Sequence, residues 1–133
     1  MLDCLIIGDS IAVGTAMARP ECVSYAKGGW NSQQWNNKYL NKVTNQPAKT
    51  VIISLGTNDH SGVHTFKELI ILRDSIQADK VYWILPPIKP DIQNNVKIIA
   101  NNYNDIVLPI QKLSNDKVHP TKEGYKILAG ATK

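Results

Sequence analysis

The sequence predicts an α/β fold, a three-layer sandwich built on a five-stranded parallel sheet. Short, continuously apolar runs recur along the chain, which is typical of strands covered on both faces. Stretches with helical spacing separate these runs, so that strand and helix alternate along the whole sequence. Several of the runs end at glycine or proline, as strands do before a turn. For five such strands we expect the flavodoxin-like order 2-1-3-4-5.

The apolar runs and helical stretches place the elements in order. The predicted strands cover residues 4–7, 22–26, 50–55, 80–85 and 105–110. Pro109 favours an edge position for the fifth strand, because proline cannot donate to both neighbours of a central ladder. Apolar residues at helical spacing predict helices over residues 66–76, 96–103 and 122–131, with a more polar stretch over residues 32–43.

Length and composition bound the class of protein. The chain has 133 residues with 43% hydrophobic and 20% charged content, which predicts one domain over residues 1–133. Its apolar runs are too short for a transmembrane helix. Strand-like sequence starts almost at Met1, so we expect no signal peptide and a cytoplasmic location. An excess of lysine, asparagine and isoleucine, whose codons are AT-rich, also fits a phage-encoded or virion-associated protein.

Charge and cysteine content exclude further classes. The net charge is +4 and the lysines are scattered, whereas nucleic-acid binding requires a basic cluster. We therefore expect no nucleic-acid or membrane partner. Cys4 and Cys22 are too few for a disulfide-stapled secreted fold, and both are expected to be small buried apolar residues.

Residue types suited to acyl transfer follow the predicted strands. In an open parallel sheet, sites form beyond the carboxyl ends of the strands where the strand order reverses. A serine, glycines, an asparagine, an aspartate and a histidine all fall at such ends, within residues 8–10, 28–31, 56–59 and 116–120. These types can supply a nucleophile, oxyanion donors, a base and a group that orients the base.

These four segments resemble, in order, the sequence blocks of the SGNH (GDSL-like) hydrolases. Gly8-Asp9-Ser10-Ile11 resembles the first block, with isoleucine where leucine is usual. Gly29 lies where the second block has its glycine, although the spacing in 26–29 departs from the family and Gly28 is an alternative. Residues 56–59 (Gly-Thr-Asn-Asp) match the third block and residues 116–120 (Asp-Lys-Val-His-Pro) the last. The resemblance spans residues 5–129.

The resemblance implies a role for each matching residue. Ser10 would be the nucleophile, His119 the general base, and Asp116 the carboxylate that orients the histidine. The backbone N–H groups of Ser10 and Gly29 and the side-chain amide of Asn58 would form the oxyanion hole. No cofactor or metal is implied, and no cap domain can be present in so short a chain.

Neighbouring residues admit more than one interpretation. Trp30 and Asp9 are candidate substrate-binding residues, although Trp30 could also pack in the core, and both Asp9 and Asp59 could fix turns through backbone hydrogen bonds. His60 and His64 have the spacing of a helical metal pair, but no third ligand is placed with them, which favours a solvated helix start.

The sequence therefore predicts a serine esterase of SGNH type that hydrolyses a short-chain acyl ester. Without a cap there is no long acyl tunnel, so O-acetyl groups on carbohydrate are the first substrate expected. The alternatives are a non-catalytic carbohydrate-binding module on the same fold, and a lipid esterase or thioesterase. A nucleotide- or flavin-binding protein is disfavoured, because no phosphate-binding loop follows the first strand. The expected partner is a small-molecule or carbohydrate ester; oligomeric state is not predictable from these residues.

Overall fold

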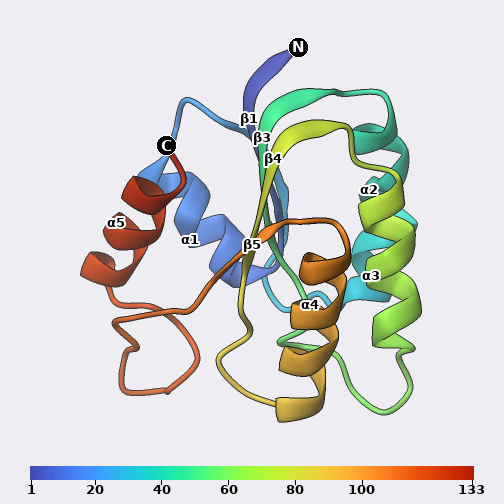
Figure 1. Ribbon diagram of the computed structural model, residues 1–133. Helices are drawn as coiled ribbons and strands as arrows, with labels where there is room; N and C mark the ends of the chain where they lie inside the picture. Colours follow the sequence, from blue (N-terminus) through green and yellow to red (C-terminus); the bar gives the residue numbers. More distant parts are fainter.

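One parallel sheet runs through the middle of the molecule, with its strands in the order β2-β1-β3-β4-β5 (Figure 1). The computed structural model describes residues 1–133. The strands are β1 (Leu2–Gly8), β2 (Val23–Ala26), β3 (Ala48–Ser54), β4 (Ala78–Ile84) and β5 (Ile106–Leu108). The predicted fold class and strand order are confirmed, and β5 lies at the edge.

Helices cover both faces of the sheet. The helices are α1 (Ser10–Ala18), α2 (Ser32–Thr44), α3 (Thr65–Asp74), α4 (Pro90–Asn102) and α5 (Lys122–Ala131). Figure 1 shows α1 and α5 on one face and the other three on the opposite face. Periodicity did not single out α1, because apolar residues lie on nearly all sides of this short helix and leave no polar face.

Alternation along the strands divides the core in two. Successive side chains of a strand point to opposite faces. Leu5 and Ile7 accordingly pack with Trp35 and the other apolar residues under α2, α3 and α4. Ile6, between them, packs with Ile11 under α1 and α5. Both faces of the central strands are therefore buried, as their unbroken apolar sequence predicted.

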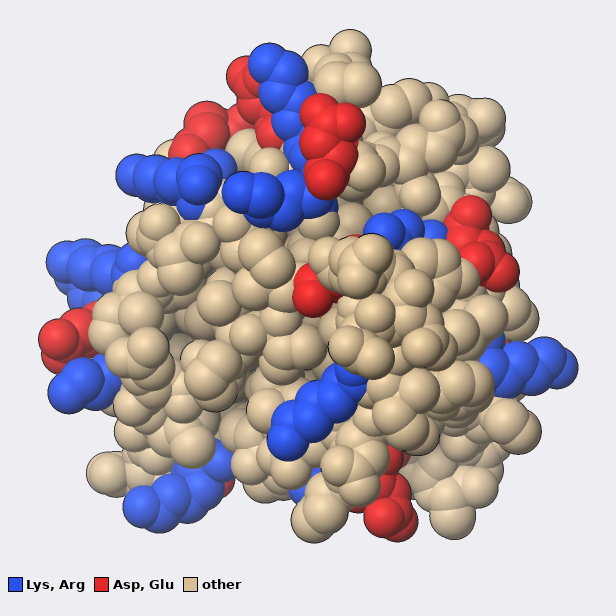
Figure 2. All heavy atoms as spheres, in the orientation of Figure 1, with Lys and Arg blue, Asp and Glu red and all other residues tan.

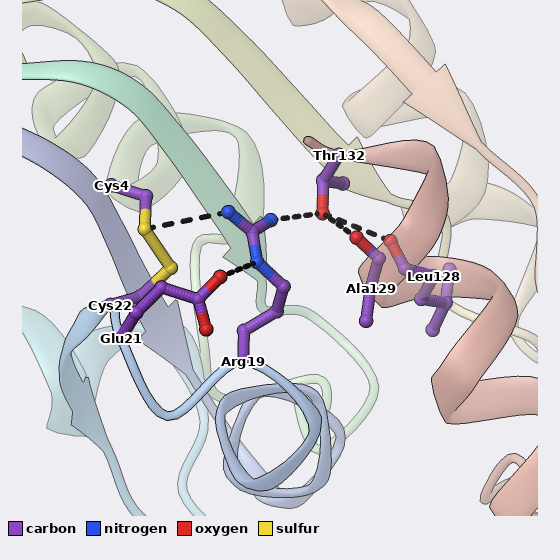
Figure 3. A network of polar contacts seen from close by, with 7 residues as sticks. All are labelled: Cys4, Arg19, Glu21, Cys22, Leu128, Ala129 and Thr132. Atoms are coloured by element: carbon purple, nitrogen blue, oxygen red, sulfur yellow. Dashed lines mark hydrogen bonds and ion pairs between the residues drawn. A yellow bond between two sulfur atoms is a disulfide. The ribbon is translucent and has the colours of Figure 1, made fainter.

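A disulfide joins Cys4 to Cys22, which corrects the expectation of two unlinked cysteines. Register explains the bond: Leu5 of β1 pairs with Val23 of β2, so the residues preceding them are neighbours. The buried guanidinium of Arg19 lies beside this bond (Figure 3). It donates to Glu21, to Cys4 Sγ at 3.5 Å and to Thr132 Oγ1 at 2.9 Å. The disulfide and Arg19 thus connect the start of edge strand β2 to β1 and to the end of α5.

The surface drawn in Figure 2 carries no concentrated charge. Lysine and arginine side chains are spread among aspartates and glutamates, and most of this face is uncharged. No helix combines the length and the apolar character that crossing a membrane requires.

Candidate active site

The nucleophile position lies at the point where β1 turns into α1. Gly8 ends β1 with a φ of 141°, and a Cβ there would lie 1.8 Å from the carbonyl oxygen of Ser54, so the turn requires glycine. Asp9 caps α1 by accepting from the N–H of Ile11 at 3.0 Å. Ser10 is then the first residue of the helix, where N–H groups have no intrahelical partner. A negative charge that develops at Ser10 would be stabilised by the helix dipole.

Three predicted residues form one chain of hydrogen bonds. Ser10 Oγ lies 2.8 Å from Nε2 of His119. Nδ1 of His119 lies 2.7 Å from Oδ2 of Asp116. Residues 109 positions apart in the sequence are thereby brought together, in the order that the sequence predicted for a nucleophile, a base and an orienting carboxylate. The side chains of His119 and Asp116 remain 43% and 50% exposed, so the site is open to solvent.

The loop that bears the histidine is tied together by the same carboxylate. Oδ1 of Asp116 accepts from the backbone N–H groups of Val118 and His119, both at 2.9 Å, and from the hydroxyl of Ser114. The hydrogen bond with the His119 ring, followed by these backbone and hydroxyl donors, holds the pKa of the Asp116 carboxyl well below its usual range. Asp116 is therefore a carboxylate that fixes both the loop and the ring.

A glycine pair after β2 lies beside Ser10. A Cβ on Gly28 would be 3.8 Å from Cβ of Ser10, while one on Gly29 would meet nothing within 4 Å. Gly29 has a φ of 80°, as the third residue of a type II turn does, which is the reason for glycine at this position. The peptide between the two glycines, whose N–H belongs to Gly29, is thus placed close to the nucleophile.

Asn58 approaches the same place from the turn after β3. Its Nδ2 donates to the backbone carbonyl of Trp30 at 3.0 Å, which orients the side-chain amide. One of the two amide protons is used in this bond, so the other is available to an oxyanion. The side chain is half-buried.

The structure corrects the prediction that Asp9 is a substrate-binding residue. Its side chain is fully buried, and Oδ1 accepts from the Ile11 N–H and from Ser54 Oγ, so it cannot contact substrate. Burial raises the pKa of Asp9 to about 6, against the lowering effect of the Ser54 and backbone hydrogen bonds. Its alternative role as a turn-fixing residue is the one that the geometry supports.

Asp59 has the corresponding role in the turn after β3. It is buried, and its carboxylate accepts from the N–H and hydroxyl of Ser32 at 2.8 and 2.7 Å and from Thr65 Oγ1 at 2.8 Å. Asp59 thus joins the N-termini of α2 and α3 to the turn that bears Asn58.

Trp30 lies between the glycine turn and α2. Its ring is half-buried, 5.9 Å from the ring of Tyr39, and Lys27 Nζ lies 5.5 Å from its centroid. The role of Trp30 in substrate binding stays a prediction.

An open groove of about 880 Å³ lies between the N-termini of α3 and α4, and Asp59, the residue after Asn58, lines it; Ser10, Asn58 and His119 do not. His60 and His64 line it, and His60 Nδ1 accepts from the N–H of Gly62 at 3.0 Å. No group of three histidine, cysteine or acidic side chains with the arrangement of a metal site is found. Lys89, Asp91 and Asn95 form part of the opposite wall.

A second groove, of about 600 Å³, runs between α1 and α5. Gly14, Met17 and Tyr125 form its apolar wall, and Lys122 and Lys126 stand at its edge. Neither groove is lined by Trp30, the candidate substrate-binding residue.

Comparison with solved structures identifies the fold. A GDSL-like lipase from Bacteroides thetaiotaomicron superposes with a TM-score of 0.71 at 18% identity, over 96% of this chain and 84% of the other. This chain has the fold of the GDSL-like lipases. An acetylxylan esterase from Geobacillus stearothermophilus shares the GDSL-like fold at a TM-score of 0.64 and 20% identity, over 98% and 91% of the two chains. An α/β hydrolase from the Lake Arreo metagenome gives 0.68 at 17% identity, over 98% and 92%. No protein-family model and no curated protein matches the sequence.

Sequence reasoning missed two residues that shape this candidate site. Ser54 binds Asp9 in the turn that bears Ser10, and Lys89 binds the turn that bears Asn58. Ser54 ends a buried strand and Lys89 lies in a proline-rich turn, so neither position has a sequence pattern that indicates where its side chain points.

Proposed function

We propose that this protein is a serine ester hydrolase that uses Ser10, His119 and Asp116. The observation that supports it most directly is the continuous chain of hydrogen bonds, 2.8 and 2.7 Å long, that joins these three side chains. A serine hydroxyl is a weak nucleophile until a base accepts its proton. Ser10 and the loop with Asp116 and His119 follow the carboxyl ends of strands of the GDSL-like fold. Open parallel sheets bind their ligands at this edge, which supports the proposal.

The proposed reaction begins with attack of Ser10 Oγ on the ester carbonyl while Nε2 of His119 accepts the hydroxyl proton. The carbonyl oxygen becomes an oxyanion, which accepts hydrogen bonds from the N–H groups of Ser10 and Gly29 and from Nδ2 of Asn58. When this tetrahedral intermediate collapses, the bond to the alcohol oxygen breaks and that oxygen takes the proton from His119. The alcohol leaves, and Ser10 remains acylated. Water then attacks the acyl group while His119 accepts a proton from it. His119 returns that proton to Ser10 Oγ as the acyl bond breaks, and the carboxylic acid is released.

We propose a short acyl group, and O-acetyl groups on carbohydrate in particular, as the substrate. Both grooves are open, and the one between α3 and α4 has polar residues such as His60, Asp91 and Asn95 that can hydrogen-bond sugar hydroxyls. The structural neighbour named as an acetylxylan esterase supports the same class. Acetate release from acetylated xylo-oligosaccharides, compared with hydrolysis of acetylated glycerol, would test this choice.

Labelling with a fluorophosphonate probe tests the catalytic proposal. The label should be found on Ser10 by peptide mapping, and Ser10→Ala should abolish both labelling and p-nitrophenyl acetate hydrolysis. Ser24→Ala is the matched control, because Ser24 is an exposed serine of β2 without a hydrogen bond of its side chain. Hydrolysis that persists unchanged in Ser10→Ala would exclude the proposed enzyme and favour a carbohydrate-binding module.

The cytoplasmic location stays a prediction, and the disulfide is evidence against it. Structural disulfides are rare in reducing cytosol and persist in oxidising compartments. The Cys4–Cys22 bond therefore favours a site of action outside the reducing cytoplasm. Quantifying free thiols in protein isolated from its source, without added reductant, would decide between the two.

A further inference from the structure

Lys89 adopts a backbone conformation that is unfavourable for its residue type and its place in the sequence. It lies in the turn between β4 and α4, with φ 65° and ψ 87°. Non-glycine residues seldom adopt positive φ, and the residue before a proline, here Pro90, favours extended conformations. Such strain persists only where the surrounding structure maintains it, and it is concentrated at functional sites.

The side chain of Lys89 binds the turn that bears Asn58. Its Nζ donates to the backbone carbonyl of Thr57 at 2.8 Å and to that of Asp59 at 2.6 Å. None of the ion pairs of the protein involves Lys89, so these two carbonyls are its partners. The side chain does not cap α4, which Lys89 precedes.

The two carbonyls belong to the residues on either side of Asn58. Thr57 and Asp59 are themselves buried, and the carboxylate of Asp59 is bound to α2 and α3. A lysine ammonium has three donors and can hold two carbonyls at once. Binding on both sides fixes the backbone from which the Asn58 side chain extends, and the bond from Asn58 to Trp30 fixes its far end.

We propose that Lys89 is a positioning residue for hydrolysis, because it holds the Asn58 amide in the geometry that the oxyanion requires. This inference rests on the proposed function of Asn58. Donors to an oxyanion act through preorganisation, so a small displacement of the amide lowers the rate of the chemical step more than substrate binding. The residue with this strained backbone is the one whose ammonium reaches across to the turn after β3.

Two substitutions separate positioning from folding. Lys89→Met removes the ammonium and keeps the length of the side chain. Lys89→Gly also removes it but relieves the positive φ, which offsets part of the stability lost with the two hydrogen bonds, so the two variants load the fold differently. Both should lower kcat for p-nitrophenyl acetate about 10- to 100-fold with little change in KM. Lys97→Met is the control, since Lys97 is an exposed residue of α4 without an ion pair.

A double-mutant cycle identifies the residue through which Lys89 acts. Asn58→Ala alone should lower kcat about 10²- to 10³-fold. If Lys89 acts through Asn58, adding Lys89→Gly to Asn58→Ala should cause little further loss. Losses that multiply in the double variant, or wild-type kcat in a folded Lys89→Gly variant, would overturn the proposal.

An NMR comparison gives a result that does not depend on hydrolysis. The side-chain amide signals of Asn58 should shift or broaden in Lys89→Gly and remain unchanged in Lys97→Met. Unchanged signals in Lys89→Gly would overturn the positioning role even if the protein is an esterase. Failure of the proposed function itself is recognised separately, by hydrolysis that persists in Ser10→Ala.

Discussion

Ser54 Oγ donates a hydrogen bond of 3.0 Å to Oδ1 of Asp9, and this bond joins the end of β3 to the turn that precedes Ser10. The other oxygen of that carboxyl, Oδ2, is buried without a hydrogen-bond partner. An unpaired buried carboxylate is costly to keep ionised. Asp9, which fixes the turn before Ser10, therefore makes the free energy of unfolding depend on pH.

The first prediction concerns this dependence. Burial raises the pKa of Asp9 from 3.8 to about 6, so between these values the folded state retains a proton that the unfolded state has lost. The free energy of unfolding should therefore fall as pH rises from 4 to 6, by about 3 kcal/mol in total. At a pH well below 4 or well above 6 both states carry the same charge at this residue, and its contribution is constant.

Urea unfolding between pH 4 and pH 7 measures this effect. Asp9→Asn should remove the decline, because asparagine can still cap α1 but does not titrate. Asp79→Asn provides the control, since Asp79 is exposed and should leave the pH dependence as it is. Parallel curves for wild type and Asp9→Asn would show that the carboxyl is ionised in the folded state throughout this range.

The residues of the proposed catalytic chain could be predicted because Ser10 directly follows β1, and the loop with Asp116 and His119 follows β5. Parallel strands bring their carboxyl ends to one edge, so Ser10, Asn58 and the loop with His119 had to lie near each other once the strand order was known. The mistaken substrate role of Asp9 has the opposite origin. Adjacency to the nucleophile in sequence does not reveal that its side chain turns inward, to the cap of α1.

Other features depend on contacts that the sequence pattern does not encode. The Cys4–Cys22 bond follows from strand register, which places the two residues side by side. The role of Lys89 depends on a backbone conformation that its sequence neighbours disfavour. Both arise from tertiary structure, and neither produces a periodic or compositional signal.

The second prediction concerns Asp116. The hydrogen bonds from His119, Val118 and Ser114 hold the pKa of this carboxyl well below its usual range, so it remains ionised as the pH falls into the mildly acidic range. The acid limb of kcat/KM should therefore report one ionisation, with a slope of one. Asp116→Asn would place an amide donor opposite Nδ1 of His119 and favour the tautomer that cannot accept the serine proton. We expect kcat to fall about 10³- to 10⁴-fold.

Asn115→Ala serves as the control for Asp116→Asn, because Asn115 is exposed in the same loop. A pH–rate profile for each variant provides the measurement. A slope of two in the acid limb of the wild type would mean that Asp116 titrates together with the base. A loss of less than tenfold in Asp116→Asn would mean that the loop, rather than the carboxylate, orients the histidine.

The third prediction concerns the disulfide. Strand β2 is a short edge strand, and the Gly28–Gly29 turn follows it directly. The Cys4–Cys22 bond, with a sequence separation of 18, closes a loop whose restriction stabilises the folded state by about 3 kcal/mol. Dithiothreitol should lower the free energy of unfolding of the wild type by about that amount and reduce kcat as the glycine turn loosens. A Cys4→Ser, Cys22→Ser double variant should show both losses without reductant and should not respond to it.

The last prediction concerns acyl length. The groove between α3 and α4 is open, and its apolar side chains, those of Val63, Phe66, Pro90 and Ile92, stand among polar ones. Each buried CH₂ can contribute about 0.8 kcal/mol only where an apolar wall receives it. We therefore expect kcat/KM for p-nitrophenyl esters to fall from acetate to butyrate and to be very low for octanoate. If kcat/KM instead rises steadily to octanoate, an apolar channel must form on binding, for which the groove between α1 and α5 with Met17 and Tyr125 is the available place. The substrate class would then be a lipid ester or thioester rather than an acetylated carbohydrate.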